Sequence, residues 1–102
     1  MIFDTAHDWL ILYFTDNRSN KIWGFFTHDS RHYAFWGGVG QAASFKDHGL
    51  WHGELIKIKH HKMNKGYHQI GLDQLVAMDP NFENMFNERF SWFKLSQSAG
   101  SF

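Results

Sequence analysis

The sequence contains no cysteine among its 102 residues and a single proline, Pro80. The absence of cysteine excludes disulfide bonds, a thiol nucleophile and zinc sites built on thiolates. It is also consistent with a reducing cytoplasm, where we expect the protein to reside. A chain of this length predicts one domain spanning residues 1–102. Without covalent cross-links, such a small domain needs a dense apolar core.

Long apolar runs are missing as well. The N-terminal stretch MIFDTAHDWLILYF has no basic residue before it, and Asp4, His7 and Asp8 interrupt it. This pattern does not fit a secretory signal. No stretch approaches the ~20 apolar residues of a membrane-spanning helix. We therefore expect no membrane association.

The chain as a whole has no excess of charge of one sign, because it has ten basic and ten acidic residues. The charge is nevertheless unevenly distributed. Residues 51–71 contain four lysines, four histidines and one acid, whereas residues 72–102 contain two basic and four acidic residues. A local basic face can bind phosphate on a neutral protein. The candidate phosphate-binding residues are Lys57, Lys59, Lys62, Lys65, His60 and His61; the alternative is a solvated helix face.

Aromatic residues are abundant, at 19% of the chain with 11 Phe and 5 Trp. Residues 7–16 are rich in β-branched and aromatic residues and predict a strand. Residues 21–28 and 32–37 predict two more strands, and the short turns between the three predict an antiparallel meander. Gly24 within the second strand indicates a bulge or a close approach from a neighbour. Residues 51–64 are compatible with either a strand or a helix, and the NKG stop favours the helix. A last strand is expected over residues 67–71.

The C-terminal region predicts an amphipathic helix. Asp79 is a candidate N-cap and Pro80 a candidate first helical residue. Phenylalanines then recur at the 3.6-residue spacing of one helix face. A short helical turn is expected before it, within residues 72–78. The aromatic stripe can pack against the sheet, or it can form a partner-binding surface made of Phe82, Phe86, Phe90, Trp92 and Phe93.

Two motifs, YAFWGGVGQ and KHHKMNKGY, resemble the WGR domain family over residues 7–71. The resemblance implies an α+β fold, with a curved antiparallel sheet and one packed helix. The C-terminal helix in residues 72–102 would then be an extension of this WGR-like core. Family members contact DNA through the motif Trp and Arg; the Trp corresponds to Trp36, but Gly38 stands in place of the arginine. This change removes a guanidinium fork suited to phosphate. The matched residues are Tyr33, Phe35, Trp36, Gly37, Val39, Gly40, Gln41, Lys62, Lys65, Gly66 and Tyr67.

The eight histidines do not form a recognisable catalytic or metal motif. His48 and His52 are four residues apart and His60 and His61 are adjacent, without an HExxH pattern or paired carboxylates. We therefore expect no catalytic residue, metal or cofactor, and no enzymatic activity. The alternative is a metal-free ribonuclease in which histidines act as acid and base and a lysine steadies the phosphorane.

Two functional hypotheses follow. The first is a small nucleic-acid-binding accessory protein, with DNA favoured over RNA, in which Trp36 stacks on a sugar or base and the basic segment contacts phosphates. The second is a protein-interaction module of phage or mobile-element type, which binds and inhibits a host protein and uses the WGR-like core as a scaffold. A homodimer through the aromatic stripe is compatible with the second hypothesis.

Overall fold

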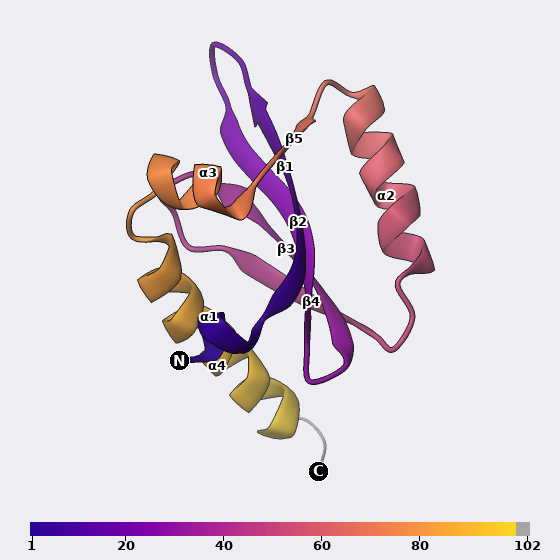
Figure 1. Ribbon diagram of the computed structural model, residues 1–102, viewed down its shortest axis with the longest axis vertical. Helices are drawn as coiled ribbons and strands as arrows, with labels where there is room; N and C mark the ends of the chain where they lie inside the picture. Colours follow the sequence, from indigo (N-terminus) through magenta and orange to yellow (C-terminus); the bar gives the residue numbers. More distant parts are fainter. Residues whose placement is uncertain (100–102) are drawn as a thin grey trace.

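The structure, a computed structural model, describes residues 1–99 and has an α+β fold (Figure 1). An open, five-stranded antiparallel sheet has the order β4-β3-β2-β1-β5. The strands are β1 His7–Thr15, β2 Asn20–His28, β3 Arg31–Gly38, β4 Ser44–Gly49 and β5 His68–Ile70. The helices are α1 Ile2–Thr5, α2 Gly53–Asn64, α3 Leu72–Met78 and α4 Phe82–Ala99.

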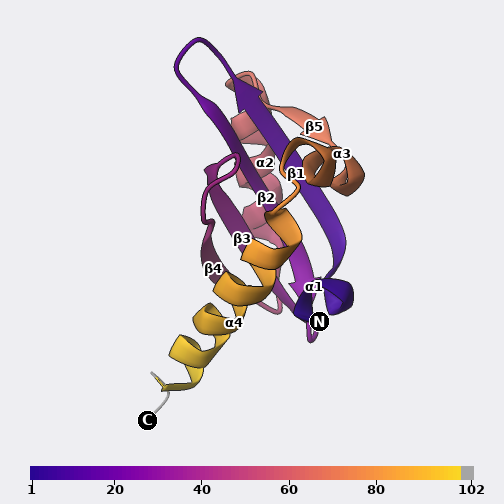
Figure 2. The same cartoon turned by 90° about the vertical axis from the view of Figure 1, so that its left-hand side faces the viewer.

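The helices are divided between the two faces of the sheet. Helix α2 covers one face, and α1, α3 and α4 lie on the other (Figure 1). Helix α4 crosses its face diagonally, and its last turns extend beyond the sheet (Figure 2). No helix within residues 1–99 is long and apolar enough to cross a membrane.

The predicted meander, central helix, short helix within residues 72–78, last strand and C-terminal helix are confirmed, whereas helix α1, strand β4 and the first residue of α4 differ from the prediction. Strand β4 was not predicted, because SFKDHG is polar and ends in glycine. Helix α4 begins at Phe82, two residues later than predicted. Asp79 accepts a hydrogen bond from the Asn81 N–H at 3.2 Å, but it does so within the turn that precedes the helix.

Gly24 marks a close approach rather than a bulge. It pairs in register with Ile11 on one side and Phe35 on the other. A Cβ atom at this position would lie 2.4 Å from the Leu10 carbonyl oxygen and 2.8 Å from the Phe35 ring. The β1–β2–β3 ladder therefore requires a residue without a side chain here.

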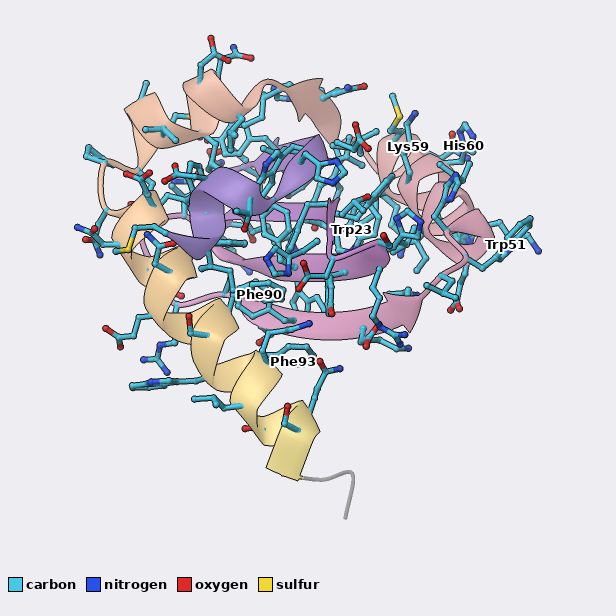
Figure 3. All side chains as sticks on the ribbon, turned by 60° about the horizontal axis from the view of Figure 1, so that its bottom comes forward. Trp23, Trp51, Lys59, His60, Phe90 and Phe93 are labelled. Atoms are coloured by element: carbon cyan, nitrogen blue, oxygen red, sulfur yellow. The ribbon has the colours of Figure 1, made fainter. Side chains whose placement is uncertain are left out.

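The face under α4 is an aromatic layer. Phe82, Phe86 and Phe90 are fully buried. The ring centroid of Phe86 lies 5.1 Å from that of Phe26, and that of Phe90 lies 4.9 Å from that of Tyr33. The prediction that these three phenylalanines form a partner surface is therefore wrong, because each helical turn inserts its ring into the chain's own core. Figure 3 shows Phe90 between α4 and the sheet.

The other two residues of the predicted partner surface, Phe93 and Trp92, differ in how much of their side chains is exposed. Phe93 is half-buried and stacks on Phe90 and Phe45 at the edge of the layer. Trp92 points outward and is 54% exposed. Of the five residues, Trp92 is therefore the one with an exposed side chain, part of which Arg89 covers.

The face under α2 is smaller and mixed in character. Leu12, Trp23, Phe25 and Ala34 of the sheet pack with Leu55 of α2 and with Tyr67. Leu55, Ile58 and Lys62 lie at i, i+3 and i+7, on the side of α2 that meets the sheet. A lysine thus replaces an apolar residue in the last turn of this helix face. The apolar contact ends at that point, and the sheet beyond it is left uncovered.

Candidate nucleic-acid interface

A pocket of about 500 Å³ opens beside the C-terminal end of α2. Its walls come from the β1–β2 turn, from the start of β2, from the end of β3 and from α2. Three aromatic side chains and three cationic side chains line it together with small polar residues. The lining residues are Arg18, Ser19, Asn20, Lys21, Ile22, Trp23, Trp36, Gly37, Gly38, Gln41, Lys62 and Tyr67.

A second pocket of about 290 Å³ continues along α2 toward β4. It shares Trp23, Trp36 and Lys62 with the first pocket, so the two pockets adjoin, and together they are here called the groove. The second pocket adds one lysine and one histidine, both from β4. The added residues are Ala34, Lys46, His48 and Ile58.

The groove carries charge of one sign. Arg18, Lys21, Lys46 and Lys62 line it, and no Asp or Glu is among the described residues that do so. The nearby Asp16 belongs to the turn itself. Its carboxylate accepts hydrogen bonds from the N–H groups of Arg18 at 2.8 Å and Ser19 at 2.6 Å, and these lower its pKa. Asp16 therefore fixes the turn that carries Arg18.

Trp36 presents the accessible aromatic surface of the groove. Trp36 and Trp23 are cross-strand partners on the same face of the sheet. Trp23 is only 5% exposed because α2 covers it, whereas Trp36 is 39% exposed because it lies beyond the last apolar turn of α2. Lys62 lies between the covered Trp23 and the exposed Trp36. Its Nζ atom is 5.0 Å from the centroid of the Tyr67 ring.

The glycine-rich loop after β3 holds Trp36 at this corner. The Val39 N–H donates to the Asn20 carbonyl at 2.9 Å, and the Gln41 N–H donates to the Gly38 carbonyl at 3.1 Å. Gly40 has a φ of +82°, a conformation that favours glycine, and its N–H donates to the Asp79 carboxylate at 3.1 Å. The rim of the groove is thus fixed both from β2 and from the turn before α4.

His48 adds a buried imidazole to the second pocket. Its side chain is 5% exposed, and its Nδ1 atom lies 3.8 Å from the Glu54 carboxylate. Burial lowers its pKa and Lys46 lowers it further, while Glu54 and Asp47 partly oppose them. Within residues 1–99, no group of three or more His, Cys, Asp or Glu side chains could hold a metal ion.

The groove contains two of the seven residues predicted for nucleic-acid binding, Trp36 and Lys62. The other five do not line it. Figure 3 shows Lys59 and His60 on the outer part of α2, away from Trp23. Lys59 is half-buried and the other four are exposed: Lys57, Lys65, His60 and His61.

Sequence reasoning missed Arg18, Lys21 and Lys46, which come from a turn and two strands far apart in the chain. Arg18 and Lys21 closely follow Asp16 and Lys46 precedes Asp47, so no run of like charge marks them. Lys21 lies on a predicted strand that pairs with the strand of Trp36, so a comparison of cross-strand neighbours on that face was the available signal for this residue. Lys46 lies on β4, which was not predicted, so no such comparison was available for it.

Comparison of the chain with protein-family models, with curated proteins and with solved structures found no match. The resemblance to the WGR family stays a prediction from the sequence.

Proposed function

We propose that the protein is a small, non-enzymatic nucleic-acid-binding protein that uses the groove as its binding site. One observation carries the proposal: an exposed tryptophan and four cations share one concave surface, which no acidic residue in the described part of the chain lines. Arg18, Lys21, Lys46 and Lys62 would contact phosphates, and Trp36 would stack on a sugar or base.

The two kinds of contact contribute differently to binding. Each phosphate that a cation neutralises releases counterions, and the slope of log K against log salt changes by roughly −0.9 in duplex DNA and −0.7 in single strands. Four cations therefore predict a slope of about −3. Aromatic stacking contributes about 1–3 kcal/mol per base and depends little on salt.

The position of Lys62 provides a matched test on a single helix. Lys62→Glu places an acid inside the groove, whereas Lys57→Glu makes the same charge change on the exposed side of α2. Anisotropy titrations with a labelled 20-nucleotide DNA should show a large loss of affinity and a shallower salt slope for Lys62→Glu, and a much smaller loss for Lys57→Glu. Equal losses for the two variants would mean that binding responds to net charge and not to the groove.

A second candidate function is a protein-interaction module that binds a host protein. The observation that favours it is the outer face of α4, where Trp92 is 54% and Leu95 67% exposed, on the opposite side of the sheet from the groove. This candidate predicts that Trp92→Ala abolishes capture of a protein partner and leaves nucleic-acid affinity unchanged. Gel filtration of the same variant reports on a homodimer through this face.

A further inference from the structure

We infer that the groove accepts an unstacked nucleobase beside Trp36, so that the ligand is single-stranded nucleic acid and not continuous duplex. This inference rests on the proposed function and narrows it to one class of ligand.

The shape of the site provides the first step. The larger pocket has a volume of about 500 Å³ and lies between the β1–β2 turn and the loop after β3. A duplex covers the flat faces of its bases by stacking and offers a protein its phosphates and groove edges. Such a surface would bridge the mouth of the pocket and leave the aromatic interior unfilled. A single strand can place a base inside it.

The exposure of the aromatic rings provides the second step. Trp23 and Tyr67 are 5% and 9% exposed and form a closed floor, whereas Trp36 is 39% exposed. Trp36 thus offers ring surface that the fold itself does not use. A base that enters the pocket can cover this surface, and every base has a flat face that can do so.

The cations provide the third step. Arg18 and Lys21 belong to the hairpin side of the larger pocket, Lys62 belongs to α2, and Lys46 lines the adjoining pocket on β4. A nucleotide whose base lies beside Trp36 has one phosphate on each side along the strand. Cations from the hairpin and from the helix–β4 side can therefore neutralise successive phosphates, as in the basic grooves that track single strands.

The polar rim predicts weak sequence preference. Ser19, Asn20 and Gln41 are the uncharged polar side chains of the larger pocket. The Asn20 side-chain oxygen already accepts a hydrogen bond from the Tyr13 hydroxyl. Few groups thus remain to read a base edge, and stacking should dominate.

The test compares three labelled ligands of equal length by fluorescence anisotropy: an oligothymidylate, a blunt duplex, and an oligomer in which every base is replaced by an abasic analogue. The abasic oligomer keeps all the phosphates and removes the stacking partner. The wild-type protein should bind the oligothymidylate about 5- to 150-fold more tightly than the abasic oligomer, the range that stacking of one base provides. It should also prefer the single strand to the duplex.

Trp36 variants make the test specific. Trp36→Ala should lower affinity for oligothymidylate by a similar factor and leave affinity for the abasic oligomer unchanged, so that the two changes are not additive. Trp36→Phe should keep most of the preference for oligothymidylate over the abasic oligomer. Trp92→Ala should keep all of this preference. Thermal unfolding by circular dichroism establishes that each variant is folded.

Two outcomes would overturn the inference in different ways. If the duplex or the abasic oligomer binds as tightly as oligothymidylate, with a steep salt dependence, the protein binds nucleic acid but the pocket does not take a base. If none of the three ligands binds at low salt, both the inference and the proposed function are wrong.

Discussion

The carboxylate of Asp79 accepts a hydrogen bond from the backbone N–H of Gly40, 39 residues earlier in the chain, at 3.1 Å. The same side chain accepts from the Asn81 N–H at 3.2 Å and is 7% exposed. One buried acid therefore connects the turn before α4 to the loop that follows Trp36. Met85 of α4 adds a second link, because its sulfur accepts a hydrogen bond from the Ala43 N–H of the same loop at 3.4 Å.

Asp79→Ala should lower the free energy of unfolding by about 1–3 kcal/mol, because two backbone N–H groups lose their acceptor. Asp79→Asn, which keeps one oxygen, should lose less. Urea denaturation measures both, and Glu88→Ala on the exposed side of α4 serves as the control. If Asp79→Ala proves as stable as that control, the link does not contribute to folding.

Gly24→Ala should destabilise the protein by about 1–3 kcal/mol, the usual cost of an inserted methyl group that cannot be accommodated. The added Cβ meets a backbone oxygen at 2.4 Å as well as an aromatic ring, and the oxygen cannot move without disturbing β1. The comparison is Gly38→Ala, whose Cβ meets only the flexible end of Gln41. Thermal melts that rank the two variants in the opposite order would contradict the close approach seen here.

Stability should fall as the pH drops from 7.5 toward 5. Burial is the largest cause that lowers the pKa of His28, His32 and His48 below the ordinary value of 6.5. For His28, Lys94 and His7 add to the lowering and Asp29 opposes it. Because the unfolded chain binds protons more readily, the stabilisation is complete above pH 6.5 and is lost as the pH falls through the folded-state values.

Chemical denaturation at several pH values measures this effect. His28 is the most informative position, because its buried Nδ1 atom makes no hydrogen bond with any described residue. His28→Asn should flatten the pH dependence, whereas His61→Gln, at an exposed position on α2, should leave it unchanged. An unaltered profile for His28→Asn would assign the acid sensitivity to other groups.

Gly38→Arg should tighten nucleic-acid binding by roughly tenfold, the effect of one charged hydrogen bond. Gly38 lines the larger pocket, and its φ lies outside the left-handed region, so a side chain is tolerated if Gln41 moves. The slope of log K against log salt should become steeper by the contribution of about one phosphate contact. Gly38→Met, similar in bulk without charge, is the control, and a gain of the same size in both variants would exclude a role for the guanidinium.

The elements with a strong local pattern could be predicted from the sequence. Strands β1 to β3 are rich in aromatic and other apolar residues, and α4 has a complete 3.6-residue repeat. Strand β4 lacks such a pattern because it is an edge strand with one neighbour. It is held by pairing with β3 and by the ion pair of Arg31 with Asp47 at 3.0 Å, neither of which is local in sequence.

The site was harder to predict than the fold. The lysine-rich segment does form a helix, but a helix spreads consecutive residues around its axis, so only Lys62 reaches the groove. The phenylalanines of α4 illustrate the same difficulty. Their spacing shows that they share a face, and only the neighbouring sheet determines that this face is internal.

The two faces of the sheet have different roles, and this difference determines which side chains can be substituted without loss of folding. The aromatic layer under α4 supplies most of the packing, while the groove is built from side chains at the margin of the smaller layer under α2. A library that randomises Arg18, Lys21, Lys46 and Lys62 should therefore yield folded proteins in most of its members, which makes this small cysteine-free sheet a tolerant frame on which new specificities can be selected.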